Sequence, residues 1–445
     1  MTNEHHPFEA LEERLQARKT EYDAMSVPDA AASRAVRAGI EQASRKRKSR
    51  LRWLTSSISA AAIILLFTGC IRVSPAFASF VEQLPGMEGV VSLIRQDKGL
   101  MMAIDQSLLQ KVGITDEHDG GSVTVEGIIT DESRMVIFYK MKNMKDTEKF
   151  DYDIDLLDEN GKHLPVAFSY SSPKPVSESE SPTYEDIIDV SFNESLPPDQ
   201  LTVVFKNRLE KTNNTWKITF PVDHTLTKNM KKVIPVNQTI TLDGQRFTVE
   251  QATLYPTRLV LDIQYDANNS KKIFGIRDLQ LVDEQGRAWR TDGASIGGYG
   301  TSVFFESMYF SIPKKLTLQA SGLSALDKDK LMIKVDPSSN KIEGGPQELT
   351  LLDYKTKGKD TIMHFSAADA ENATSGLSFT NIKDSTGKDF DVKESGWSPS
   401  GEHGTAEAWV TISNGTAAKG KLSMEIYSYP VQSRSPFSLE IPVNK

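Results

Sequence analysis

The chain has 445 residues, a formal net charge of −8 at pH 7 and a single cysteine, Cys70. One cysteine excludes an intrachain disulfide and a cluster of thiolate metal ligands, and an acidic, mostly polar chain is poorly suited to binding nucleic acid or anionic polymers. The length predicts two to four domains.

Residues 1–52 are predicted to form two short amphipathic helices. Each has an apolar stripe at helical spacing, and the second begins at an approximate capping box, residues 26–29. Two helices of this length cannot bury a core of their own. The region is therefore either a solvated tail that sets membrane topology or a helical hairpin that buries its apolar face against a protein partner. Under the second interpretation, the apolar contact residues are Leu11, Leu15, Val36 and Ile40.

Residues 53–71 form an uncharged run that predicts one transmembrane helix. At about 1.5 Å per residue such a helix extends roughly 28 Å, close to the hydrocarbon thickness of a bilayer. Six cations lie in the eight residues before it and only Arg72 follows closely, so the positive-inside rule places residues 1–52 in the cytoplasm and the chain after Arg72 outside. The cations expected to fix this topology and to contact anionic lipid are Arg45, Lys46, Arg47, Lys48, Arg50 and Arg52.

Two patterns near this run suggest other anchors. Residues 66–70 resemble a lipobox, in which Cys70 would be lipidated, and residues 76–78 resemble a signal-peptidase site. Either one would require a cytoplasmic leader of more than fifty residues, far longer than a usual charged n-region. The uncleaved anchor is therefore the favoured interpretation, and the lipoprotein is the second. Export of a chain without disulfides also suits a Gram-positive cell surface.

Residues 72–112 are predicted to form a stalk that packs onto the first outer domain. Proline and glycine residues recur at its beginning and interrupt regular secondary structure there. Apolar residues predict a short helix around residues 90–94 and another over residues 100–109.

After the stalk, apolar residues alternate with a period of two, and the pattern repeats. The segment that begins at Val123 has a counterpart at Phe247, and an Asp-Glu-x-Gly turn ending at Gly161 has one ending at Gly286, at offsets of 124 and 125 residues. A fainter third copy begins at Leu349. The turns are predicted to be hairpin turns in which glycine supplies a positive φ.

Each copy holds some seven short strands in about a hundred residues, which fits an immunoglobulin-like sandwich, while the missing Cys…Trp…Cys core excludes an antibody-type domain. The predicted fold class is mainly β, with tandem immunoglobulin-like β-sandwich domains outside the membrane, one transmembrane helix and a short α-helical tail. The strand-like residues 331–335 are assigned to the second copy. The expected domains are the tail (1–52), the span (53–71), the stalk (72–112) and three sandwiches (113–224, 225–338 and 339–445).

No pattern in the chain indicates a catalytic or metal site. Residues 293–297 match the Gly-x-Ser-x-Gly nucleophile elbow, but a strand follows where a helix is required, so a glycine-rich loop is expected. The aspartates of residues 151–155 alternate like calcium ligands, yet Leu156 occupies a position that an EF-hand reserves for glycine, and an edge strand with acids facing water is the better interpretation. Residues 116–119 are expected to form a loop. We therefore predict no enzyme, no cofactor and no metal.

Three juxtamembrane motifs resemble a known family. Residues 73–78 (Val-Ser-Pro-Ala-Phe-Ala), 84–87 (Leu-Pro-Gly-Met) and 97–100 (Asp-Lys-Gly-Leu) follow a single span and a basic tail, as in the Gram-positive membrane family called domain of unknown function 4179. The second sandwich resembles its usual companion, domain of unknown function 5643, and the likeness covers roughly residues 20–340. The tail adds further similar positions, namely Val27, Pro28, Ala35, Gly39 and Ala43.

The resemblance implies a function. Members of this family are often taken to be anti-sigma factors, so the implied partners are an extracytoplasmic-function sigma factor, membrane lipid, and an unknown outer ligand or the cell wall, with no direct nucleic acid. The chain lacks the His-x3-Cys-x2-Cys pattern of zinc-binding anti-sigma domains, so the tail would bind without that metal fold. The hypothesis is a single-pass plasma-membrane regulator, and the alternative is a surface-anchored adhesion or cell-wall spacer protein with an inert tail.

Overall fold

The described part of the chain is mainly β and contains several antiparallel sheets. The computed structural model describes residues 93–94, 96–144, 152–171, 174–175, 183–192, 195–207, 215–297, 300–367, 376–400, 405–430 and 435–443. All of them belong to one unit, Ser79–Lys445. Within these ranges no helix is long and apolar enough to cross a membrane, and the predicted span, residues 53–71, lies outside them.

A short helix, α5 (Lys98–Asp105), precedes the first strand. Asp97 begins it, because this carboxylate accepts a hydrogen bond from the Leu100 amide at 2.9 Å. The helix buries one apolar face, which includes Leu100. It begins and ends earlier than the expected residues 100–109, since Asp97 supplies the cap and Ser107, with a φ of 62°, turns the chain toward the first strand.

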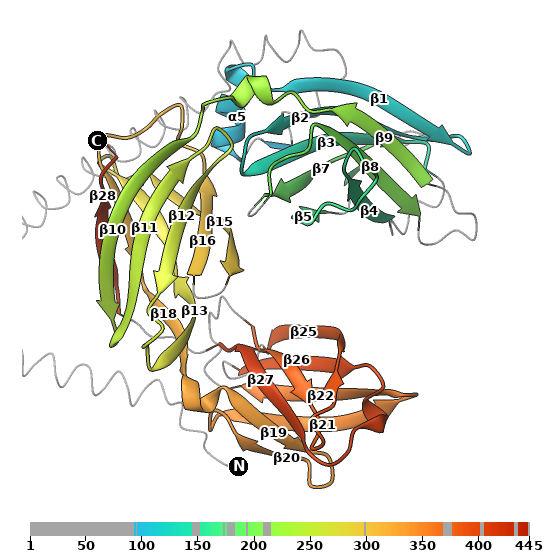
Figure 1. The fold of residues 1–445 in the computed structure, drawn as a ribbon, viewed down its shortest axis with the longest axis vertical. Coiled ribbons are helices and arrows are strands. Elements are labelled where there is room, and N and C mark those ends of the chain that lie inside the picture. The colour runs from blue at the N-terminus through green and yellow to red at the C-terminus, as the bar shows by residue number, and fades with distance from the viewer. Residues whose placement is uncertain are drawn as a thin grey trace, which may run out of the picture. The chain divides into compact units, whose positions relative to one another are not determined.

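The first β region, strands β1 to β9, has two sheets that share one core (Figure 1). One sheet has the order β1-β2-β3-β7-β5, with β6 also paired to β7, and the other has the order β4-β8-β9. In β9 (Thr215–Pro221), Trp216, Ile218 and Phe220 are buried, as the period of a strand with one buried face requires. The other strands are β1 (Gln110–His118), β2 (Gly121–Thr130), β3 (Arg134–Lys142), β4 (Tyr152–Leu157), β5 (Ala167–Tyr170), β6 (Lys174–Pro175), β7 (Thr183–Ser191) and β8 (Gln200–Asn207).

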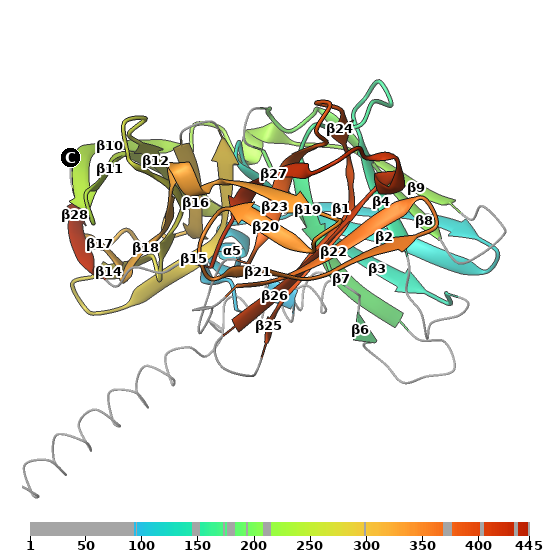
Figure 2. The same cartoon turned by 90° about the horizontal axis from the view of Figure 1, so that it is seen from below.

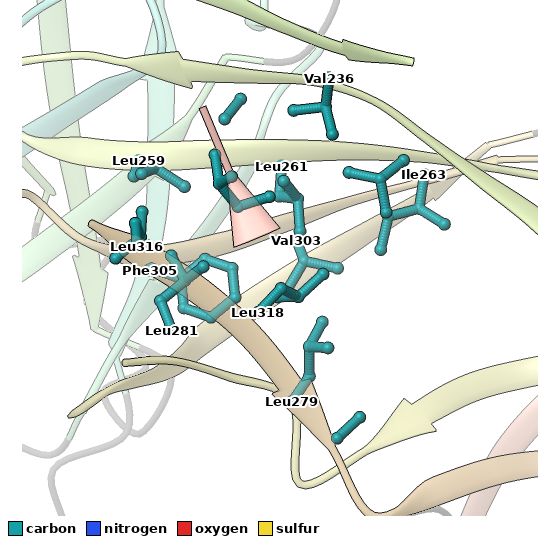
Figure 3. Close-up of a cluster of buried hydrophobic side chains, with 14 of the residues drawn as sticks. Val236, Leu259, Leu261, Ile263, Leu279, Leu281, Val303, Phe305, Leu316 and Leu318 are labelled. Atoms are coloured by element: carbon teal, nitrogen blue, oxygen red, sulfur yellow. The ribbon is translucent and has the colours of Figure 1, made fainter. Parts of the chain in front are cut away.

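The second β region, strands β10 to β18 with β28, is built on an eight-stranded sheet of order β10-β11-β12-β16-β15-β14-β17-β28, and β13 pairs with β18. Leu261 and Phe305, from β12 and β16, are fully buried in one cluster with Leu281 and Leu318, from β14 and β17 (Figure 3). The 3-10 helix η1 (His224–Thr227) precedes this region. Its strands are β10 (Lys232–Leu242), β11 (Gln245–Leu254), β12 (Arg258–Tyr265), β13 (Lys271–Arg277), β14 (Gln280–Asp283), β15 (Ala288–Gly297), β16 (Gly300–Glu306), β17 (Leu316–Ala320), β18 (Gly322–Asp327) and β28 (Phe437–Ile441).

The third β region, strands β19 to β27, has sheets of order β20-β19-β27-β23-β24 and β21-β22-β26-β25 (Figure 2). Val335, Phe365 and Met424 are fully buried in the cluster that both sheets share. The 3-10 helices η2 (Lys328–Lys330) and η3 (Gly415–Ala417) join strands of this region to their neighbours in sequence. Its strands are β19 (Met332–Asp336), β20 (Lys341–Gly344), β21 (Leu349–Lys357), β22 (Asp360–Ala367), β23 (Ser378–Lys383), β24 (Asp389–Phe390), β25 (Val392–Ser400), β26 (Thr405–Ile412) and β27 (Leu422–Ser428).

Two strands pair within β regions other than those to which the sequence assigned them. β28, inside the expected domain 339–445, pairs with β17 of the second region, where Leu439 lies opposite Leu318. β19, assigned to the second copy, pairs with β20 and β27 of the third. Both strands alternate apolar and polar residues, and this period does not specify which sheet edge a strand joins.

The three β regions share one pairing pattern. The register shifts after Val125 where β2 pairs with β3, after Val249 where β11 pairs with β12, and after Leu351 where β21 pairs with β22. In the first two regions, a pair of threonine hydroxyls also bridges adjacent strands at 2.7 and 2.8 Å. The internal copies in the sequence are therefore copies in the structure as well, including the faint third one.

The Asp-x-x-Gly turns also agree in all three β regions. Asp158, Asp283 and Asp384 each accept hydrogen bonds from the backbone amides two and four residues later, at 2.8 to 3.2 Å. Each turn needs glycine at its fourth position, because the φ there is in the left-handed region. The glycines are Gly161, Gly286 and Gly387, with φ of 73°, 80° and 84°.

We expect the Asp384 turn to make stability depend on acid pH. A hydrogen bond from the Thr386 hydroxyl, followed by backbone amides, lowers the pKa of Asp384. A carboxyl group whose folded pKa lies below its unfolded value, about 3.9, stabilises the fold above that pH and loses the effect as pH falls through the folded pKa. The Asp384→Asn variant keeps an acceptor oxygen but does not titrate, so its Tm should fall less steeply below about pH 4.

The measurement is Tm against pH for wild type, Asp384→Asn and a control, Asp389→Asn, which changes an exposed aspartate of the same hairpin. An Asp384→Asn profile as steep as that of the wild type would contradict the prediction.

Candidate functional site

Two equivalent turns of the internal repeat meet between the first and second β regions. Residues 131–134 lead into β3 and residues 255–258 lead into β12, and each turn closes with a backbone hydrogen bond of 2.9 Å. The Thr257 amide donates to the Asp131 carboxylate at 2.8 Å. Asp131 also accepts from the Ser133 and Arg134 amides of its own turn. One buried carboxylate therefore holds both turns together.

Arg134 ties three elements to this point. Its side chain is only 4% exposed, and its Nη2 lies 2.6 Å from Asp189 on β7. Its Nη1 donates to Asp97, the residue that caps α5, at 3.0 Å and to the Thr257 carbonyl at 3.2 Å. Burial alone would lower the pKa of Arg134, but hydrogen bonds and the charge of Asp189, with the charges of Asp97 and Asp292, outweigh it and raise the pKa. Arg134 thus stays charged.

Arg258 occupies the equivalent position in the second copy. Its side chain is also 4% exposed. Its Nη1 donates to the Ser191 hydroxyl at 3.0 Å, and its guanidinium lies 4.5 Å from the centroid of the Phe304 ring. Burial and the positive charge of Arg134 lower the pKa of Arg258 to about 10. Two guanidinium groups are therefore held side by side, and carboxylates from both β regions compensate their charge.

Helix α5 also contacts the second β region directly. A Cβ added at Gly99 would lie 2.7 Å from the backbone nitrogen of Ser307, so the helix approaches this residue more closely than any side chain permits. The Ser307 hydroxyl donates to the Tyr255 carbonyl at 2.7 Å and links the same contact to the turn. The motif at residues 97–100 thus has a structural reason: a cap, a close approach and a buried leucine.

An open cavity of about 250 Å³ lies beside these residues. Strand β5 of the first β region and strand β15 of the second both contribute to its wall. Asp292 lines the cavity with its side chain 47% exposed, and its carboxylate lies 3.8 Å from Arg134. Burial, supported by the charges of Asp97 and Asp189 and opposed by Arg134, raises the pKa of Asp292. The cavity lining includes Phe168, Ser169, Asp189, Arg258, Asp292 and Phe304.

We call this assembly the junction; it consists of Asp97, Gly99, residues 131–134, Asp189, residues 255–258, Asp292 and Ser307. The sequence predicted none of these residues as a site. Arg134 and Arg258 could have been found from the sequence, because both begin equivalent strands of the repeat. Asp189 and Asp292 could not have been found in this way, since each is an isolated acidic residue within an ordinary strand.

The site residues that the sequence did predict lie outside the described residues. They are Leu11, Leu15, Val36 and Ile40 for the sigma contact, Arg45, Lys46, Arg47, Lys48, Arg50 and Arg52 for topology and lipid, and Cys70 for lipidation.

The patterns that were judged not to be sites are ordinary strands and turns. Residues 293–297 end strand β15 and do not form the expected loop. Asp153 and Asp155 lie on β4, at an edge of its sheet, with Ile154 buried between them. Residues 116–118 belong to β1, so only the last residue of that predicted loop lies in the turn. Among the described residues, no group of three histidine, cysteine or acidic side chains could hold a metal ion.

Comparison with protein families identifies two domains that meet at the junction. Domain of unknown function DUF4179 matches residues 48–143, and the family of unknown function DUF5643 matches residues 231–355. The first contains Asp97 and Arg134, whereas the second contains Arg258 and Asp292. The resemblance recognised in the sequence is thus confirmed for both domains.

Comparison with curated proteins gave no match. Among solved structures, the chain is similar to a conserved domain protein from Bacillus anthracis, with 15% identity and a TM-score of 0.37, over 58% of this chain and 86% of that one.

Proposed function

We propose that the protein is a single-pass membrane regulator whose outer β regions control a cytoplasmic tail through helix α5. The observation that carries the proposal is the position of Asp97, which both caps α5 and pairs with Arg134 in the junction. A change that opens the junction removes a partner of the capping residue and uncovers the contact between Gly99 and Ser307. Helix α5, which lies within the predicted stalk, then loses its attachment to the two β regions.

The domain matches support this arrangement. The DUF4179 match begins at residue 48, within the basic run, and extends through the predicted span, α5 and β3. A single domain therefore includes both the segment expected in the membrane and one half of the junction. We propose that residues 53–71 cross the plasma membrane, with the β regions outside as tandem immunoglobulin-like sandwiches and with no enzymatic activity.

We further propose that the tail is an anti-sigma module that binds an extracytoplasmic-function sigma factor. The support is its two apolar stripes, which have no core of their own to enter, and the resemblance to DUF4179 proteins. The expected contact residues are Leu11, Leu15, Val36 and Ile40.

Capture of a sigma subunit by the full chain in its native host tests this role. Tagged protein purified from membranes should bring down a sigma subunit, identified by mass spectrometry. A variant with aspartate at the four contact residues should lose at least about 90% of it, because a buried unpaired carboxylate costs several kcal/mol.

A matched control places aspartate at polar positions of the same tail, Gln16, Thr20 and Gln42, and should retain capture. Absence of a sigma subunit from the wild-type sample, at endogenous expression, would favour the adhesion or wall-spacer alternative.

A further inference from the structure

We propose that the cavity between β5 and β15 binds a zwitterionic amino acid or a short peptide, with the ligand's carboxylate at Arg258 and its ammonium group at Asp292. The inference deepens the proposed function, because it gives the outer β regions a ligand, and it rests on that function for its role in signalling. Binding itself follows from the chemistry of the cavity wall.

Arg258 provides the site for the carboxylate. Its side chain is 96% buried by neighbouring groups, yet its Nε has no hydrogen-bond partner among the described residues. This Nε is enclosed by neighbouring atoms, so a ligand in the cavity would be held by the Nη groups, of which Nη2 makes only a long contact of 3.4 Å with Asp189. Its other contacts, to Ser191 at 3.0 Å and Asp189 at 3.4 Å, hold the guanidinium at the cavity wall.

Asp292 provides the site for the ammonium group. Its carboxylate is half exposed at the cavity, and at 3.8 Å from Arg134 it is beyond the range of a good hydrogen bond. Arg134 is instead engaged by Asp189 and Asp97 at 2.6 and 3.0 Å. Asp292 therefore has room for a second cation, and an ammonium group that donates to it makes a charge-assisted hydrogen bond.

The local balance of charge selects a zwitterion rather than an anion. Four carboxylates, those of Asp97, Asp131, Asp189 and Asp292, surround the guanidinium groups of Arg134 and Arg258. A plain anion would add a negative charge to a cluster that already has an excess of them. A ligand with one charge of each sign satisfies Arg258 without this penalty.

The size and walls of the cavity fit a small ligand. A volume of about 250 Å³ is just below the usual range for drug-sized molecules, and the cavity is open to solvent. Phe168 and Phe304 provide apolar parts of the wall, and Ser169 adds a hydroxyl group. Arg258 and Asp292 both belong to the second β region, so a ligand held by them reaches the first β region through Phe168 and Ser169 of β5.

The test measures binding of small probes to the full chain in detergent micelles. Binding is detected as a rise in Tm and as heat in isothermal titration calorimetry. The probes are the twenty standard L-amino acids, D-alanine, and the dipeptide Ala-Ala in its L,L and D,D forms, each at about 10 mM, since millimolar affinity suffices at this concentration. We expect at least one probe to raise Tm saturably. Its N-acetyl and amide derivatives should each bind at least about tenfold more weakly, because each lacks one charge.

Two variants locate the site. Asp292→Asn, which keeps the shape of the side chain, should weaken binding about tenfold or more, and Ala294→Trp should abolish it by filling the cavity. Asp329→Asn, at an exposed aspartate of η2, is the matched control and should bind as the wild type does.

The inference is overturned if no probe raises Tm or produces binding heat, or if both site variants bind as tightly as the wild type. Neither outcome affects the capture of a sigma subunit by the same preparation. Conversely, ligand binding without sigma capture would refute the anti-sigma role and leave the binding site established.

Discussion

Replacing Arg134 with methionine is expected to lower the free energy of unfolding of the junction by about 3–5 kcal/mol. Methionine fills a similar volume but leaves Asp97, Asp189 and Asp292 facing one another without the cation that now compensates them. It also removes the donor to the Thr257 carbonyl. The cost is large because Asp97 and Asp189, at 17% and 24% exposure, are mostly buried and lose the cation that pairs with both.

Hydrogen exchange of the full chain measures this effect where it occurs. The Thr257 amide, which donates to Asp131, should lose protection by about two to four orders of magnitude in Arg134→Met, as that free energy implies. Arg246→Met is the control. Arg246 also lies near an aspartate, Asp266, at 3.8 Å, but both side chains are accessible, at 60% and 27% exposure, so its loss should cost less than about 1 kcal/mol. Equal effects of the two substitutions would contradict the central role of Arg134.

Replacing Gly99 with alanine is expected to destabilise the contact between α5 and the second β region by about 1–2 kcal/mol. Alanine is the better helix former by up to about 1 kcal/mol, so helix propensity alone predicts the opposite sign. The new Cβ would lie 2.7 Å from the Ser307 backbone nitrogen, which cannot rotate away as a side chain does. The helix must shift, and Asp97 shifts with it.

The sign of this change is the informative result. Gln106→Ala, at the exposed C-cap of the same helix, should leave the free energy of unfolding within about 0.5 kcal/mol of the wild-type value. A Gly99→Ala chain that is as stable as the wild type, with unchanged exchange of the α5 amides, would show that the helix does not depend on close packing against Ser307.

Both substitutions act on a contact between two domains, DUF4179 and DUF5643, that occur together in this chain. Asp97 and Arg134 come from one domain, and Thr257, Arg258 and Ser307 from the other. Without the second β region Asp131 loses the Thr257 amide, and without the first Arg258 loses Ser191 and Asp189. This interdependence gives a physical reason for their occurrence in one chain.

The sequence by itself determined the strand pattern and two of the turns of the described part, although residues 116–118 and 293–297 were expected to form loops and are strands. Period-two alternation predicted strands, and the Asp-Glu-x-Gly turns ending at Gly161 and Gly286 were predicted because glycine supplies the positive φ that such a turn requires. The repeat was visible because equivalent strands need equivalent residues. These features depend on neighbours along the chain, so the sequence contains them directly.

Tertiary structure alone decided the junction and the partners of two strands. Asp189 is 55 residues from Arg134 in the sequence, and Thr257 is 126 residues from Asp131, yet each pair is hydrogen-bonded. β28 joins β17 across more than a hundred residues, since any alternating strand can add to an open sheet edge. A buried charge network arises only where distant turns meet, and no period or motif along the chain specifies that meeting.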